Sequence, residues 1–202
     1  MASFEKKLPL EQWQQILANV SHSDLCNVML TSRHMNSVAS WPHMWAGMNI
    51  NMEKVRKEGL APLYAINRFK NVDKYMSFDG MTLTTAELDW VLNDIPASPI
   101  QSLNLEWNKL SCVSADLLAR TVKSLTSVNL NSTNLTMQQC EKLLEASLDS
   151  TTLAHLDLCH AYLSRVPPNL LASAVKSLTS VGLARTLMTK EQCKKILEAS
   201  LD

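Results

Sequence analysis

Four residues that lie close together in the sequence have side chains capable of chemistry: His155, Asp157, Cys159 and His160. A cysteine beside a histidine is the pairing used by thiol nucleophiles, and two histidines with a cysteine and an aspartate could bind zinc. Side chains alternate along a β-strand, so His155, Asp157 and Cys159 are expected on one flat, solvated face. Such a face supplies neither a desolvated pocket nor a tuned pKa. We therefore expect no catalytic residue, no metal and no cofactor here.

These residues lie within an internal repeat. The segments 125–149 and 178–202 are identical at about two-thirds of their positions, at an offset of 53 residues. The segments that begin at Ile100 and Leu153 also match each other. A 53-residue unit therefore divides into halves of 25 and 28 residues. Regular self-similarity of this length is typical of a solenoid built from stacked units.

Each half-repeat carries the pattern L-x-x-L-x-L-x-x-x-x-L. The L-x-L part predicts a short strand whose two apolar side chains point inward. The copies are Leu103/Leu105/Leu110, Val128/Leu130/Leu135, Leu156/Leu158/Leu163 and Val181/Leu183/Met188, with a degenerate earlier copy at Met76/Phe78/Leu83.

A helix is expected after each strand. Thr84, Thr136 and Thr189 each precede a Glu or Gln three residues later, which is the pattern of a capping box. Pro167-Pro168 marks the same boundary in another half-repeat, because proline suits the first turn of a helix. Cys140 and Cys193 occupy equivalent positions and are predicted to face inward, together with Leu143, Leu144 and Leu148.

The repeat resembles the leucine-rich repeat, especially the long helical kind found in the ribonuclease-inhibitor group. The resemblance implies an α/β solenoid of parallel strands and helices over residues 72–202, with about five repeats. Leucine-rich repeats usually have Asn three residues after L-x-L, and here only Asn108 conforms. Thr133, Ala161 and Thr186 take that position elsewhere. Since Ala161 has no polar side chain, its turn is expected to be irregular or hydrated.

The last repeat raises a question about the end of the array. Terminal repeats of a solenoid usually carry a polar cap, and none is visible in the final repeat before Leu201-Asp202. We expect that the chain is either a fragment of a longer array or ends in an exposed edge.

The first 50 residues differ from the rest and predict a small group of helices. Pro9 suits a first helical turn, and Trp13, Ile16, Leu17 and Val20 then recur at helical spacing. So small a unit cannot bury every apolar side chain that it presents. The excess either binds a partner or packs on the neighbouring module, and the residues alone favour neither. Residues 51–71 are expected to form a helical connector.

This segment is similar to the F-box motif and aligns with it without a gap. The matching residues are Leu8-Pro9, Glu11, Ile16-Leu17, Asp24-Leu25, Val28, Leu30, Ser32-Arg33, Val38-Ala39 and Met44-Trp45. The resemblance implies a small all-α module that binds a Skp-type adaptor and, through it, a cullin. It also implies a non-catalytic subunit that recruits a protein target to a cullin ubiquitin ligase. The residues that would contact the adaptor are Leu8, Pro9, Ile16, Leu17, Leu25, Val28, Met29, Ser32 and Trp45.

The solenoid offers a surface for the target protein, whose identity the sequence does not reveal. Outward strand positions of such a sheet form a concave face. Trp and Arg are enriched at binding hot spots, so Trp107 is the foremost candidate. Alternatively, Trp107 folds over the adjacent loop as local packing. The candidate residues for target binding are Asn104, Glu106, Trp107, Asn129, Asn131, His155, Asp157, His160 and Arg185.

Composition limits the other functions. Lys+Arg and Asp+Glu balance at 19 each, so concentrated basic charge for nucleic acid is lacking. No apolar run approaches the roughly 20 residues that span a bilayer, and Met1 to Leu10 lacks the apolar core of a secretory signal. Five cysteines without a C-x-x-C motif suggest a reduced protein in the cytoplasm, the nucleus or both. The alternative to a ligase subunit is a leucine-rich-repeat scaffold or inhibitor whose helices merely cap the solenoid.

Overall fold

The computed structural model describes residues 9–17, 28, 75–98 and 100–201. The chain divides into two compact units, Met1–Asp73 and Lys74–Asp202, which we describe separately. None of the helices in the described part is long and apolar enough to cross a bilayer.

The described part of the first unit is α1 (Leu10–Leu17) together with Val28. Pro9 directly precedes the helix, and its carbonyl accepts hydrogen bonds from the amides of Gln12 and Trp13 at 3.0 and 3.3 Å. Proline suits this place because its missing N–H would have no partner inside the helix. The remaining predicted helices and the connector 51–71 lie outside the described residues.

The second unit is built on a sheet of five parallel strands in which spatial order follows chain order. The register joins equivalent repeat positions, since Leu103 lies opposite Val128 and Leu156 lies opposite Val181. The predicted combination of parallel strands and helices is confirmed. The strands are β1 (Tyr75–Ser77), β2 (Ser102–Asn104), β3 (Ser127–Asn129), β4 (His155–Asp157) and β5 (Ser180–Gly182).

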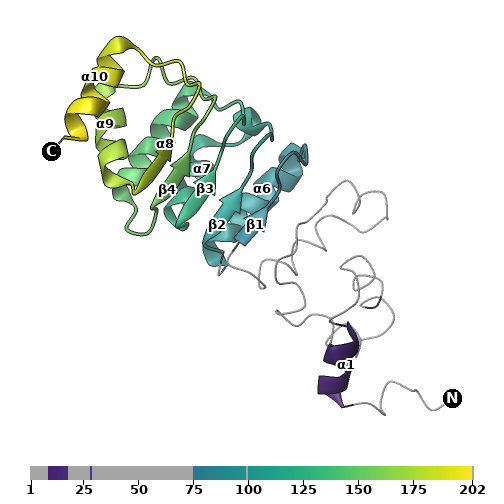
Figure 1. The fold of residues 1–202 in the computed structure, drawn as a ribbon. Helices are drawn as coiled ribbons and strands as arrows, with labels where there is room; N and C mark the ends of the chain where they lie inside the picture. Colours follow the sequence, from purple (N-terminus) through teal and green to yellow (C-terminus); the bar gives the residue numbers. More distant parts are fainter. Residues whose placement is uncertain (1–8, 18–27, 29–74, 99, 202) are drawn as a thin grey trace. The chain divides into compact units, whose positions relative to one another are not determined.

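A helix follows each strand, and the helices form a second row beside the sheet (Figure 1). Successive helices pack on one another, so each strand–helix unit contacts the next. The inward strand residues Leu103, Leu105, Leu156 and Leu158 are at most 2% exposed between the two rows. The helices are α6 (Thr85–Asp94), α7 (Ala115–Lys123), α8 (Met137–Asp149), α9 (Pro168–Ser177) and α10 (Lys190–Ala199), with short 3-10 turns η3 (Ile95–Ala97) and η4 (Leu110–Cys112).

The three predicted capping boxes are present at the starts of α6, α8 and α10. In α8, the side chain of Gln139 accepts from the amide of Thr136 at 2.7 Å. The same side chain donates to the carbonyls of Leu110 and Val113, both at 2.7 Å. Gln192 of α10 bonds in the same way to the unit before it. Each of these buried glutamines therefore caps its own helix and fastens it to the preceding unit.

The turns after the strands satisfy their buried polar groups in different ways. Asn108 is 1% exposed; it donates to the carbonyls of Phe78, Leu105 and Glu106 and accepts from the amide of Leu83. At the equivalent position, the hydroxyl of Thr133 donates to the carbonyl of its own strand, 2.6 Å away.

Of the two expectations for the turn at Ala161, irregular or hydrated, the structure contradicts the irregular one. The amide of Ala161 donates to the carbonyl of Leu158 at 3.0 Å, as the amide of Asn108 does to that of Leu105. The preceding residue, His160, has the same left-handed φ as Trp107 before Asn108. The backbone alone therefore closes this turn.

Two inward-facing predictions for the helices are wrong. Cys140 is buried as expected, and its burial raises the pKa of the thiol to about 11. Its counterpart Cys193 is exposed, because no unit of the described residues covers that side of α10. Leu148 is 42% exposed, although Leu143 and Leu144 are buried.

The role of Gln139 is tested by substitution. Gln139→Ala leaves two buried carbonyls without a donor and removes half of a capping box, so the free energy of unfolding should fall by about 2–4 kcal/mol. Urea denaturation followed by circular dichroism measures the change. The matched control is Gln138→Ala, at an exposed position of the same helix, with an expected change of about 0.5 kcal/mol or less. Equal effects of the two substitutions would contradict the assignment.

Candidate interaction surface

The outward side chains of the strands form one face of the sheet, which we call the strand face. Its residues are half-buried or exposed, whereas the residues between them are buried in the first four strands and half-buried in the last. The alternation arises because side chains of a strand point to opposite sides. The strand face comprises Ser102, Asn104, Glu106, Ser127, Asn129, Asn131, His155, Asp157, Cys159, Ser180, Gly182 and Ala184.

A short carboxamide or carboxylate ends three of the strands and folds back onto the chain. Asn104 and Asn129 each accept from the amide two residues later at 2.9 Å, and Asp157 does so at 2.8 Å. Asn and Asp favour this local turn because their side-chain oxygen reaches that amide without strain. Three predicted site residues are thereby held in equivalent orientations on neighbouring strands.

Glu106 lies at the centre of a polar cluster on the strand face. One of its carboxylate oxygens accepts from Asn129 at 3.0 Å, and the other accepts from Asn131. Ser132 in turn donates to the side-chain oxygen of Asn131 at 2.9 Å. The structure therefore brings three predicted residues, Glu106, Asn129 and Asn131, into one hydrogen-bonded group, which fixes the direction of the carboxylate.

Asp157 occupies the space that a side chain at Gly182 would need. A Cβ added to Gly182 would lie 2.5 Å from Oδ1 and 2.6 Å from Cγ of Asp157. Non-bonded atoms do not approach so closely. Gly182 therefore lacks a side chain because the carboxylate of Asp157 occupies that space, and not because its backbone conformation requires glycine. Gly182 is half-buried on the strand face.

The thiol of Cys159 is poorly suited to nucleophilic chemistry. Burial and a hydrogen bond to Asp157 raise its pKa, which lowers the fraction of reactive thiolate at neutral pH. His155 is exposed. In the part of the chain that the structure describes, no three His, Cys, Asp or Glu side chains gather in a way that could hold a metal.

A column of left-handed residues continues the sheet beyond the strands. Trp107, His160 and Arg185 have φ of 59°, 62° and 55°, at equivalent places in their repeats. The amide of Trp107 donates to the carbonyl of Asn131, just beyond the next strand, and the amide of His160 donates to the carbonyl of Ala184. We call Gly80, Trp107, Ser132, His160 and Arg185 the turn column. In the first four members the backbone amide is bonded to the next unit, and the side chains of the column are displayed at the edge of the sheet.

Trp107 is 59% exposed, and His160 and Arg185 are exposed as well. Local packing over the adjacent loop would bury most of the indole, but in the structure most of it is exposed. Trp107 thus presents a large apolar surface to solvent beside the polar strand face, an arrangement typical of binding hot spots.

Sequence reasoning missed two exposed apolar residues next to the turn column. Tyr162 is 62% exposed and Leu187 is 60% exposed, each two residues after a member of the column. Lys109 and Asn134 hold the same repeat position in other units. Comparison with these polar counterparts is the signal that could have identified Tyr162 and Leu187.

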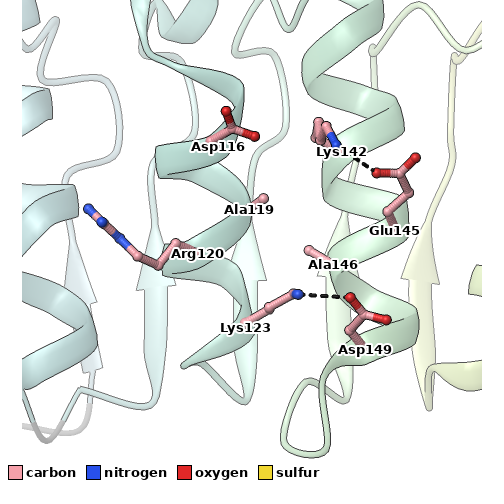
Figure 2. A pocket seen from close by; sticks show the side chains of 8 residues that line it. All are labelled: Asp116, Ala119, Arg120, Lys123, Lys142, Glu145, Ala146 and Asp149. Atoms are coloured by element: carbon pink, nitrogen blue, oxygen red, sulfur yellow. Dashed lines mark hydrogen bonds and ion pairs between the residues drawn. The ribbon is translucent and has the colours of Figure 1, made fainter.

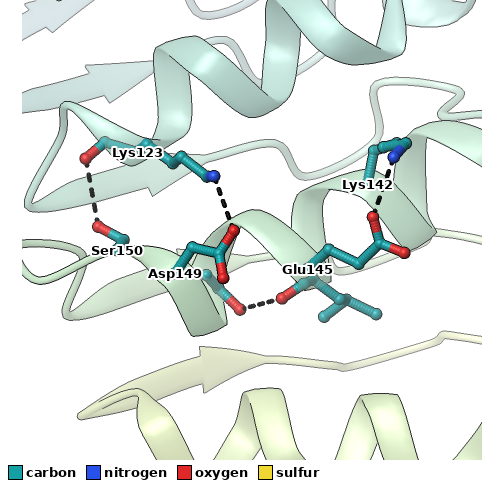
Figure 3. Close-up of polar contacts among 7 residues, drawn as sticks. Lys123, Lys142, Glu145, Asp149 and Ser150 are labelled. Atoms are coloured by element: carbon teal, nitrogen blue, oxygen red, sulfur yellow. Dashed lines mark hydrogen bonds and ion pairs between the residues drawn. The ribbon is translucent and has the colours of Figure 1, made fainter.

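The opposite, helical side of the sheet carries a groove of about 350 Å³ between α7 and α8 (Figure 2). Lys123 pairs with Asp149 at 2.8 Å, and Lys142 pairs with Glu145 at 3.1 Å (Figure 3). Arg120 points away toward α6, where it donates to Asn93. Exposed ion pairs of this kind contribute little and leave no unbalanced charge for a ligand. We therefore place the candidate site on the strand face and the turn column.

The predicted adaptor-contacting residues are only partly within the described chain. In α1, Ile16 is 49% exposed and Leu17 is 3% exposed. Pro9 is exposed, and Val28 is half-buried. Leu8, Leu25, Met29, Ser32 and Trp45 lie outside the described residues.

Comparison with known protein families bears on the first unit. The model of the F-box-like family matches residues 6–51. The chain carries an F-box-like domain. The match covers the segment in which the F-box resemblance was found, and that part of the prediction is confirmed.

Comparison with solved structures bears on the second unit. The tropomodulin C-terminal domain of Caenorhabditis elegans is similar, with a TM-score of 0.51 and 18% sequence identity. The similarity covers 68% of this chain and 88% of that chain. At so low an identity it supports the α/β fold alone. No curated protein sequence matches the chain.

The contact between Gly182 and Asp157 predicts coupled stability effects. Gly182→Ala should force the carboxylate off the amide of Cys159 and lower the free energy of unfolding by about 0.5–1.5 kcal/mol. In an Asp157→Ala background the same substitution should be neutral or stabilising, because the space is then empty. Urea denaturation of the four proteins measures the coupling. An identical effect of Gly182→Ala in both backgrounds would show that the close approach is not responsible.

Proposed function

We propose that this protein is the target-recruiting subunit of a cullin ubiquitin ligase. The F-box-like domain binds a Skp-type adaptor, and through it a cullin, while the strand face and turn column bind a protein target. The single observation that carries this proposal is the F-box-like match at residues 6–51. The subunit has no catalytic residue, cofactor or metal of its own, and contributes proximity by holding the target near activated ubiquitin.

The exposed side of α1 supports the adaptor-binding part. Ile16 exposes about half of its side chain, 49%. An exposed branched apolar residue beside a buried one, Leu17, suits a helix that packs within its own unit through one side and contacts a second protein through the other.

We further propose that the second unit is a leucine-rich-repeat array. The L-x-L strands, the buried Asn108 and the five parallel strands in chain order support this assignment. Such arrays use outward strand positions to bind other proteins. The surface for the target then comprises Asn104, Glu106, Trp107, Asn129, Asn131, His155, Asp157, His160 and Arg185, and the protein works in the cytoplasm, the nucleus or both.

Adaptor binding is tested with a single substitution on α1. Ile16→Asp places a charge on an exposed apolar position, so affinity for a purified Skp-type adaptor should fall at least tenfold, or about 1.4 kcal/mol. Calorimetric titration measures it. The matched control is Gln12→Asp, on an exposed polar position of the same helix, which should bind like the wild type. If the wild-type protein itself fails to bind adaptor in the micromolar range, the ligase function is wrong.

Target binding is tested in cells in which cullin activity is blocked, so that captured proteins accumulate. Trp107→Ala should remove proteins that co-purify with the wild type, while the adaptor and cullin remain. Lys123→Ala, on the helical side, is the control and should leave both sets unchanged. Affinity mass spectrometry compares the three proteins. Retention of every target by Trp107→Ala would exclude this residue from the binding surface.

A further inference from the structure

The charge on the strand face has one sign. Glu106 and Asp157 are its two carboxylates, and none of its members is Lys or Arg. The neighbouring unit adds the exposed Asp79, which precedes Gly80 of the turn column as Glu106 precedes Trp107. Arg185 follows β5, with β3 and β4 between it and the end of β2. The ion pairs of the described residues join side chains of α7, α8 and α10, so none of them neutralises these carboxylates.

The carboxylate of Glu106 is oriented by neutral groups and keeps its charge. One oxygen accepts from the carboxamide of Asn129 at 3.0 Å, and the other accepts from that of Asn131. An ionised carboxylate has about four acceptor sites, so each oxygen retains room for a further donor. Lys109, exposed three residues later, makes no ion pair with Glu106 within the described chain. A partner with a positive charge and two donors would therefore meet a carboxylate that already points in a fixed direction.

Trp107 places an aromatic ring directly beside Glu106 in the chain. The amide of Trp107 donates to the carbonyl of Asn131 at 3.1 Å, and the side chain of the same Asn131 donates to Glu106. One asparagine therefore fixes both the backbone that carries the indole and the direction of the carboxylate. The indole is mostly exposed and Glu106 is half-buried. The end of β2 thus combines an oriented negative charge with a large aromatic surface open to solvent.

We propose that the end of β2 is an arginine subsite of the target-binding surface, in which Glu106 binds the guanidinium and the indole of Trp107 stacks on it. Arginine suits both groups, because its planar guanidinium gives two parallel hydrogen bonds to a carboxylate and also stacks on aromatic rings. The ammonium of lysine is a compact and strongly hydrated charge without this fork. The occupant is a segment of a target protein that carries an arginine, and charge complementarity specifies it. This proposal rests on the target-recruiting function proposed above and adds the chemistry of the target.

The test selects peptides from a phage-displayed library of random sequences on the full wild-type chain and, in parallel, on Glu106→Gln. Peptides retained by the wild type should carry arginine at one position at least tenfold more often than those retained by Glu106→Gln. The tightest wild-type binder is then synthesised, and its affinity is measured by calorimetric titration. Citrulline in place of its arginine keeps the shape and removes the charge, and should weaken binding at least tenfold. Lysine in the same place should weaken it roughly fivefold.

A matched set of protein variants locates the subsite. Glu106→Gln and Trp107→Ala should each weaken the synthetic peptide at least tenfold. Glu141→Gln, at a half-buried glutamate of α8, is the control and should bind like the wild type. Glu106→Gln also changes the bonds to Asn129 and Asn131, so the citrulline peptide provides a comparison that alters no residue of the protein.

Three results would overturn the subsite: no enrichment of arginine on the wild type, equal affinities of the arginine and citrulline peptides, or equal affinities of Glu106→Gln and Glu141→Gln. Adaptor binding is measured on the same wild-type protein, which separates this proposal from the ligase function. If the adaptor binds and arginine is not selected, the subsite alone is wrong. If the adaptor does not bind, the ligase function is wrong, and with it the role of this surface in recruiting a target.

Discussion

A three-residue strand cannot bury its own leucines, so every unit of this solenoid depends on its neighbours. The parallel register sets Leu103 against Val128 and continues through the sheet, which gives each inward side chain a partner on the next strand. The polar groups of the turns obey the same constraint. Gln139 donates to two carbonyls of the preceding unit, and Asn108 likewise donates to the carbonyl of Phe78 in the unit before its own. Burial and hydrogen bonding therefore act between units more than within them.

This dependence between units constrains the inward side chains and leaves the outward side chains free to vary. The inward strand positions must be apolar, and they are Leu, Val, Met or Phe in every unit. The strand face and turn column are free of this demand. They accommodate Glu106 with its two carboxamide partners in one place, and Trp107 or Arg185 at the edge. The variation among repeats therefore falls on the strand face and the turn column, which form the proposed target surface.

Periodicity revealed the strands, the capping boxes and the outward positions, because each follows from local spacing. Periodicity failed to predict burial where burial depends on the neighbouring unit, since Cys193 repeats the position of Cys140 yet is exposed. Long-range bonds were equally hidden, since nothing near Gln139 in the sequence indicates that it reaches Leu110. The approach of Asp157 to Gly182 required coordinates for the same reason. The F-box-like segment was found by the joint spacing of common residues, which no single position reveals.

The buried glutamines give the solenoid a direction. Gln139 donates to carbonyls 29 and 26 residues earlier in the chain, and Gln192 repeats both separations. A ribosome releases the polypeptide from its N-terminus, and folding of a domain proceeds as segments emerge. Each glutamine therefore meets acceptors that have already left the ribosome. The bonds made by these two glutamines can therefore form during synthesis without waiting for residues still to be made.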